Sequence, residues 1–133
     1  MKIERLDHFV LTVADIQRTV DFYTQVMGMK AEMFGAGRIA LHYGQQKINL
    51  HLKGHEIEPK ALHAVCGSAD LCFITSTPIE DVMSELQSRG VEVIDGVVPR
   101  TGALGAIQSI YFRDPDGNLI EVSQYIDRVT QVD

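Results

Sequence analysis

The sequence predicts an α+β protein built from two copies of one unit, in which a strand and a helix are followed by three strands. Two observations support this prediction. The 133-residue chain contains two amphipathic helical segments. Each of these segments is preceded by one short β-branched or aromatic run and followed by three more. The order strand, helix, three strands therefore occurs twice, and we expect two βαβββ modules.

The first module opens with an apolar strand at residues 8–13. Asp15 is a good N-cap for the helix that follows, and Gly28 is suited to its end. Between them, apolar residues from Ile16 to Met27 recur at helical spacing. Turns rich in glycine and polar residues then separate three expected strands, at residues 30–34, 39–43 and 47–52.

The second module opens with a strand at residues 71–75. Thr77-Pro78-Ile79-Glu80 has the pattern of a capping box with proline at the first helical position, and Gly90 is suited to the end of this helix. Three strands are expected at residues 91–98, 107–112 and 118–124. We therefore expect one domain over residues 1–126, with module 1 at about 3–52, a linker at 53–68, module 2 at about 69–126 and a C-terminal tail at 127–133.

Composition limits the classes of function. Hydrophobic residues make up 45% of the chain and charged residues 23%, which is typical of a soluble globular protein. No apolar run approaches the roughly 18 residues of a membrane span, and the N-terminus lacks the apolar core of a signal peptide. We therefore expect a cytoplasmic protein in which Cys66 and Cys72 are free thiols. The net charge of −6, with scattered Lys and Arg, argues against a nucleic-acid or membrane partner and favours a small-molecule substrate.

Four polar residues occupy matching positions in the two modules. His8 and Asp70 lie in the opening strands, and His51 and Glu121 lie in the closing strands. Strand alternation predicts that both closing-strand residues point to the face opposite to their immediate apolar neighbours. Two imidazoles and two carboxylates suit a first-row divalent ion, so we expect His8, His51, Asp70 and Glu121 to bind Zn, Ni, Mn or Fe. Two alternatives stay open: a strand histidine is often structural, and an aspartate at a strand start is often a turn residue.

Three segments carry a resemblance to a known family. Residues 6–13 (LDHFVLTV), 22–29 (FYTQVMGM) and 114–121 (DPDGNLIE) resemble the vicinal oxygen chelate superfamily, which contains glyoxalases, bleomycin resistance proteins and extradiol dioxygenases. Within it, residues 67–75 (GSADLCFIT) and 100–103 (RTGA) are similar to the branch called glyoxalase domain-containing protein 5. The resemblance implies paired βαβββ modules in an open, cupped, mixed β-sheet around a metal, often in a homodimer.

The resemblance also implies a function. We expect a metal-dependent lyase or isomerase of the glyoxalase I kind, which acts on a small oxygenated substrate through a metal-stabilised enediolate. Glu121 is the expected base, and Asp70 is the second choice. The ligand types are exchanged relative to the superfamily, which usually has histidine at the position of Asp70 and often glutamate at that of His51.

Two alternatives for the function and one further site residue remain. An extradiol-type Fe(II) dioxygenase would need only the two histidines and Glu121, and a metal-free small-molecule binding or resistance protein would need none of the ligands. Residues 100–105 are interpreted either as a mobile lid, in which Arg100 binds an anionic substrate, or as a flexible loop between strands. We also expect a homodimer, because open sheets leave unpaired strand edges.

Overall fold

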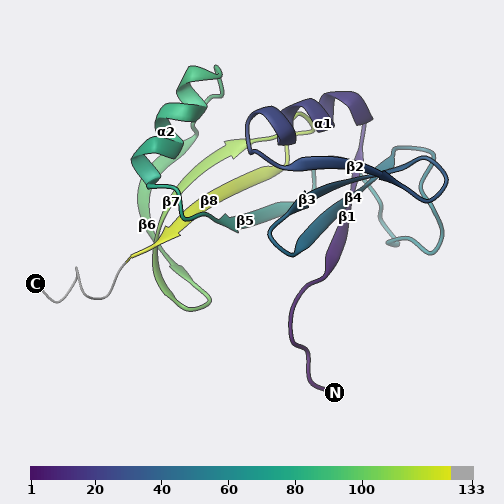
Figure 1. The fold of residues 1–133 in the computed structure, drawn as a ribbon, viewed down its shortest axis with the longest axis horizontal. Helices are drawn as coiled ribbons and strands as arrows, with labels where there is room; N and C mark the ends of the chain where they lie inside the picture. The colour runs from purple at the N-terminus through teal and green to yellow at the C-terminus, as the bar shows by residue number, and fades with distance from the viewer. Residues whose placement is uncertain (127–133) are drawn as a thin grey trace, which may run out of the picture. The chain divides into compact units, whose positions relative to one another are not determined.

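A computed structural model describes residues 1–126 (Figure 1), and the expected tail at 127–133 lies outside the described residues. Its elements confirm the α+β class and the two βαβββ modules. No helix in the described part of the chain is long and apolar enough to cross a membrane. The first module consists of β1 (His8–Val13), α1 (Ile16–Gln25), β2 (Lys30–Phe34), β3 (Arg38–Tyr43) and β4 (Gln46–Leu52). The second consists of β5 (Asp70–Ile74), α2 (Ile79–Ser88), β6 (Asp95–Gly102), β7 (Gly105–Arg113) and β8 (Leu119–Tyr125).

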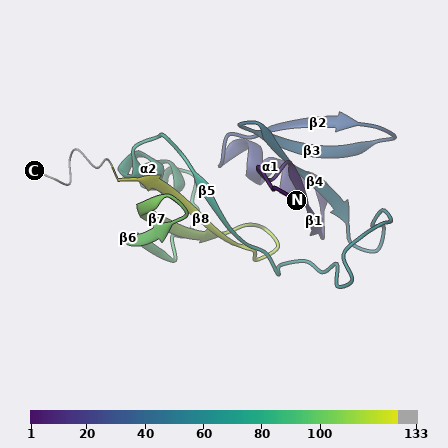
Figure 2. The same cartoon turned by 90° about the horizontal axis from the view of Figure 1, so that it is seen from below.

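Each module forms its own four-stranded sheet, with the strand orders β1-β4-β3-β2 and β5-β8-β7-β6. In both sheets the opening strand runs parallel to the closing strand and the other pairs are antiparallel, so the sheets are mixed. The chain divides into two compact units: Met1–Ala69 with Pro115–Gly117, and Asp70–Asp114 with the chain from Asn118. The linker at 53–68 contains no helix or strand (Figure 2).

The first sheet has one apolar and one polar face, because successive strand residues point to opposite sides. Buried Leu11, Leu41 and Ile48 share the apolar face, and α1 lies against β2, β3 and β4. The predicted N-cap is confirmed: the Asp15 carboxylate accepts a hydrogen bond of 2.9 Å from the backbone N–H of Arg18. Burial of these apolar residues therefore leaves the opposite face of the sheet to the polar side chains.

The start of α2 differs from the prediction. Pro78 occupies the N-cap position, and no side chain of the expected capping box makes a capping hydrogen bond. Instead, the backbone N–H of Ile79 donates to Oε1 of Gln124, on strand β8, at 3.0 Å. The capping-box prediction is therefore wrong, because a residue distant in sequence already satisfies this helix N-terminus.

Residues 100–105 belong to a β-hairpin, whereas both interpretations from the sequence, a mobile lid or a flexible loop, assumed a segment outside the strands. Arg100–Gly102 belongs to β6 and Gly105 begins β7, so that only Ala103 and Leu104 form the hairpin turn. The backbone N–H of Leu104 donates to the hydroxyl of Tyr125 at 3.0 Å. Cross-strand pairing therefore continues through Gly102 and resumes at Gly105.

The DPDG segment between β7 and β8 has a structural role. The buried carboxylate of Asp114 accepts hydrogen bonds from the backbone N–H of Asn118 at 2.9 Å and from its side-chain amide at 2.8 Å. Asp116, which belongs to the first unit, accepts a hydrogen bond of 3.1 Å from the backbone N–H of Ala14. Both carboxylates of this segment are thus committed to fixing the backbone.

Candidate functional site

The predicted site residues fall on two separate units. His8 and His51 lie on β1 and β4 of the first unit, and Asp70 and Glu121 lie on β5 and β8 of the second. The described residues, 1–126, contain no group of three or more His, Cys, Asp or Glu side chains that could hold a metal ion. The four-residue ligand set therefore stays a prediction, and each half of it is described on its own unit.

On the first unit, the two histidines share a face of the sheet but lie at different positions along the strands. His8 is the register partner of Lys47, whereas His51 is the partner of Thr12. The offset of four residues corresponds to about 13 Å along the strands. Register thus separates two residues that the sequence grouped in one predicted ligand set.

The ring of His8 is held by a neighbouring carboxylate. Its side chain is 46% exposed, and its Nδ1 lies 2.8 Å from Oδ2 of Asp7. Because an ionised carboxylate only accepts hydrogen bonds, Nδ1–H donates and the lone pair of the neutral ring lies on Nε2. This hydrogen bond also lowers the pKa of the Asp7 carboxyl. A carboxylate behind a histidine is a common support for metal-ligating imidazoles.

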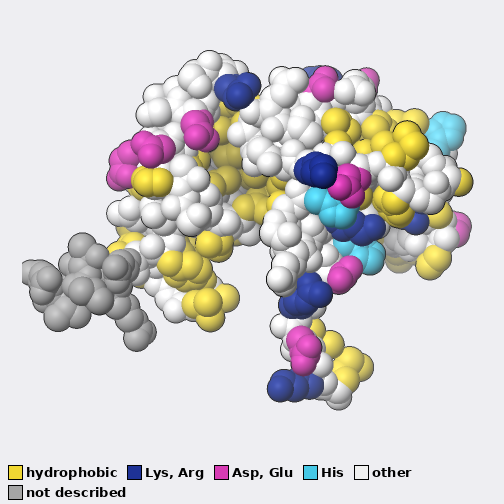
Figure 3. Space-filling model, in the orientation of Figure 1, with side chains coloured by type: hydrophobic (Ala, Val, Ile, Leu, Met, Phe, Trp, Pro, Cys, Tyr) yellow, Lys and Arg dark blue, Asp and Glu magenta, His cyan; other side chains and the backbone are white. Residues whose placement is uncertain are grey.

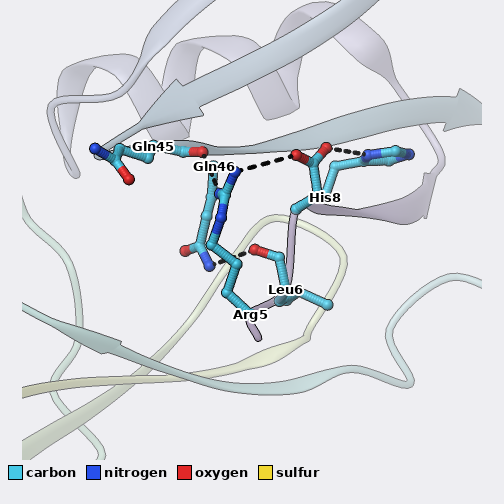
Figure 4. A network of polar contacts seen from close by, with 6 residues as sticks. Arg5, Leu6, His8, Gln45 and Gln46 are labelled. Atoms are coloured by element: carbon cyan, nitrogen blue, oxygen red, sulfur yellow. Dashed lines mark hydrogen bonds and ion pairs between the residues drawn. The ribbon is translucent and has the colours of Figure 1, made fainter. Parts of the chain in front are cut away.

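The chain just before β1 is held against the β3–β4 turn (Figure 4). Arg5 donates to the backbone carbonyl of Gln45 at 3.3 Å, and the Gln46 amide donates to that of Leu6 at 2.7 Å. Arg5 also lies 3.8 Å from the Asp7 carboxylate. These contacts fix the position of Asp7 and, through it, the ring of His8.

His51 is placed differently. It is 5% exposed, and its Nδ1 accepts a hydrogen bond of 3.4 Å from the backbone N–H of Ile57. Burial, together with the positive charge of Arg38, lowers the pKa of His51 and favours the neutral ring. A neutral ring that accepts at Nδ1 carries its proton on Nε2. To bind a metal through Nε2, His51 would have to release Ile57 and change tautomer.

Asn49 is a polar residue on the same face that the sequence analysis did not select. It is 4% exposed, and its Oδ1 has no hydrogen-bond partner among the described residues. Asn49 is the register partner of Val10, so it lies two positions from the level of His8, whereas His51 lies four positions away. The signal in the sequence was the position of Asn49 two residues before His51 in one strand, because this spacing places both side chains on the same face.

On the second unit, two buried serines hold the carboxylate of Glu121. Ser109 donates to Oε2 of Glu121 at 2.6 Å, and Ser123 donates to the same oxygen at 3.2 Å. Both serines are fully buried, and their hydroxyls lie 2.6 Å apart. Glu121 is therefore a half-buried carboxylate with a fixed orientation, on the face of the sheet opposite to buried Ile120 and Val122.

Asp70 and Cys72 share that face of the second sheet. Cys72 is the register partner of Glu121, and Asp70 lies two positions along the strand, exposed at the start of β5. Sγ of Cys72 lies 3.3 Å from the Ser123 hydroxyl. Desolvation raises the pKa of the Cys72 thiol, so it stays protonated at neutral pH and is a poor nucleophile.

Arg100 is held within the second sheet. Its Nε donates to the hydroxyl of Tyr111 at 3.0 Å, and its guanidinium lies 3.7 Å from the Asp95 carboxylate. Tyr111 is the register partner of Glu121, and burial raises the pKa of its hydroxyl. Arg100 is 43% exposed and therefore keeps access to solvent on the same face as Glu121.

The fold and the polar residues described on each unit point to a class of protein. Comparison with known proteins identifies that class. Residues 5–122 match the Glyoxalase/Bleomycin resistance protein/Dioxygenase superfamily, to which this chain belongs. It is 59% identical to Virulence protein STM3117 of Salmonella typhimurium strain LT2, over 95% of this chain and 88% of that protein. It is 54% identical to Glyoxalase domain-containing protein RDO1 of Mycosarcoma maydis, over 96% of this chain and 72% of that protein.

Two solved structures are also similar. The integron cassette protein VCH_CASS1, from the mobile metagenome of V. cholerae, is 63% identical, with a TM-score of 0.93 over 95% of this chain and 98% of that chain. Lactoylglutathione lyase of Agrobacterium tumefaciens is 20% identical, with a TM-score of 0.73 over 93% of this chain and 96% of that chain. At this lower identity, the second likeness shows a shared fold alone.

Proposed function

We propose that this protein is a metal-dependent lyase or isomerase of the glyoxalase I kind, which acts on a small oxygenated substrate. The observation that carries the proposal is the Glu121 carboxylate, which Ser109 holds at 2.6 Å on a half-buried sheet face. A carboxylate fixed in this way is suited to take a proton from a substrate carbon. Asp70, which is exposed at its strand start, is the less favoured base.

The donor set fits a divalent ion in part. The exposed Nε2 of His8 and the carboxylates of Asp70 and Glu121 are suitable ligands for Zn, Ni, Mn or Fe, and His51 becomes one only after it releases Ile57. When bound, such an ion would act as a Lewis acid on the substrate oxygens. The chain itself would orient Glu121 through Ser109, and Arg100 would bind an anionic part of the substrate.

The finer placement in the glyoxalase domain-containing protein 5 branch belongs to the same proposal. It is supported by the similarity to RDO1, itself a glyoxalase domain-containing protein. The cytoplasmic location is likewise a prediction from the sequence.

One observation favours a second candidate function. Because Nδ1 of His51 accepts the Ile57 N–H, this residue is committed to a structural hydrogen bond. A metal-free small-molecule binding protein would keep that bond. An extradiol-type Fe(II) dioxygenase would need His51 as well as His8 and Glu121 as ligands, so the same observation disfavours it.

Elemental analysis of the purified protein tests the metal. We expect one divalent ion per chain, and His8→Ala should lower the occupancy sharply while the fold stays intact, because the side chain of His8 is exposed. His42→Ala is the matched control: this histidine also lies on the first sheet, but it faces Glu32 at 3.4 Å and should leave occupancy unchanged. Equal metal in the native and His8→Ala proteins would exclude His8 as a ligand.

Light scattering tests the proposed homodimer. β1 and β5 are edge strands of their sheets, with Val10 44% exposed and Ile74 54% exposed, and a second copy would cover such unpaired edges. We expect a particle of twice the 14.8 kDa chain mass at micromolar concentration. A monomer under these conditions would contradict the prediction.

A further inference from the structure

We propose that the polar face of the first sheet binds a small oxyanion, of the phosphate or carboxylate type, through Arg38 and Lys47. This proposal does not depend on the proposed enzyme function, because none of the four predicted metal ligands carries it. It depends on the charge of one sheet face, on two cations without acidic partners, and on a buried donor without an acceptor.

The register of β2, β3 and β4 defines the charge of this face. Lys47 pairs with His42, which pairs with Lys30, and Arg38 pairs with Phe34. Because alternate residues share a face, Lys30, Arg38 and Lys47 point to the same side as Glu32. Three strand cations thus oppose one strand carboxylate, in a chain whose net charge is −6. Figure 3 shows Lys, Arg and His side chains over β1 on the visible face, with Asp and Glu side chains among them.

The cations on this face are not equivalent. Lys30 lies 3.4 Å from the carboxylate of Glu32 and is therefore neutralised locally. Arg38 and Lys47 form no ion pair with any carboxylate of the described residues; both lie against the ring of Phe34, at 4.7 Å and 3.9 Å from its centroid. Two like charges that contact one phenyl ring repel each other, and an anion that binds both cations would replace this repulsion with attraction.

One of these two cations also has a buried donor without a partner. Nε of Arg38 is buried and has no acceptor among the described residues. Unsatisfied buried donors are unfavourable, and the oxygens of an anion would satisfy the guanidinium.

Two carboxylates lie near enough to oppose binding. Lys47 contributes to lowering the pKa of Asp7, but that carboxylate is held by His8 at 2.8 Å. Glu56 raises the pKa of His51, which Arg38 lowers. Its Oε1 lies 3.6 Å from Nζ of Lys60, whereas its Oε2 is buried without a hydrogen-bond partner among the described residues. Neither carboxylate forms an ion pair with Arg38 or Lys47, so both cations remain available to an anion.

The proposal is tested by measuring the binding of inorganic phosphate and of malonate to the full chain. The protein is first stripped of metal and dialysed free of chelator, and the ionic strength is held constant. We expect saturable binding of at least one of the two, with a shift of the Arg38 Nε–H resonance in NMR spectra. Preference for phosphate or for malonate identifies which type of oxyanion the site takes. Arg38→Gln and Lys47→Gln should each weaken binding about tenfold or more, with far-UV circular dichroism confirming their folds.

Lys30→Gln is the matched control, because it removes the same charge from the same face but from a cation that Glu32 already pairs. It should change the dissociation constant less than about twofold. Failure of both anions to bind would overturn the proposal. Equal weakening by Lys30→Gln and Lys47→Gln would also overturn it, because binding would then reflect only the general field of the face. Since the protein is free of metal, neither result bears on the enzyme proposal.

Discussion

Glu121→Gln, loaded with metal, should retain some metal binding but lose turnover by about 10²–10⁴-fold, the usual effect of removing a general base. Glutamine keeps the shape of the side chain and one ligating oxygen, and it can still accept the hydrogen bond from Ser109. It has almost no basicity, so proton transfer from carbon is lost. Exchange of the carbon-bound proton of a verified substrate with solvent deuterium, followed by NMR, measures this step directly.

His51→Gln is the companion variant for this experiment. If His51 ligates the metal, its replacement should remove metal and activity together, whereas Glu121→Gln separates the two. Native turnover by metal-loaded Glu121→Gln would show that Glu121 is at most a ligand. The proton would then have to go to Asp70 or to another base.

Gly67→Ala should strongly destabilise the first unit. Gly67 has φ +77°, and a Cβ at this position would lie 2.5 Å from the backbone oxygen of Asp116, closer than real Cβ atoms approach. The left-handed conformation costs about 1–2 kcal/mol for an L-residue. The forced backbone shift adds about 1–3 kcal/mol by analogy with overpacked sites. The free energy of unfolding, from urea denaturation, measures the sum.

Gly54→Ala is the control that separates these two contributions. Gly54 lies in the same linker with φ +84°, but nothing lies within 4 Å of its added Cβ. It should therefore show the conformational cost alone. Equal losses for the two variants would mean that the backbone near Asp116 relaxes freely, and the predicted clash would be refuted.

Local patterns were sufficient for the order of the elements. The repeated strand–helix–three-strand order, the helix start at Asp15 and the split of Ile120 and Glu121 onto opposite sheet faces all follow from interactions within a few residues. Strand alternation and helix capping are short-range properties, so they can be read without knowing the partner strands. The boundaries were less exact: the strand expected at 91–98 is β6 at Asp95–Gly102.

Other features depended on partners distant in sequence. Gln124, rather than the expected capping box, satisfies the start of α2, and pairing with β7 turns the expected lid into a hairpin. The orientation of Glu121 depends on Ser109, twelve residues away on the neighbouring strand. No pattern around Gln124 or Ser109 marks these roles, because they arise only when two strands or a strand and a helix are placed side by side.

The sequence by itself determined the fold class, the two modules and the face on which each candidate ligand points, since these follow from local periodicity. Only the tertiary structure decided the positions of those residues along the strands and the tautomer of His51. The period of two along a strand assigns a face but not a register, so the offset between His8 and His51 was not readable. The tautomer of His51 likewise depends on a backbone N–H, that of Ile57, which the folded linker places against the ring.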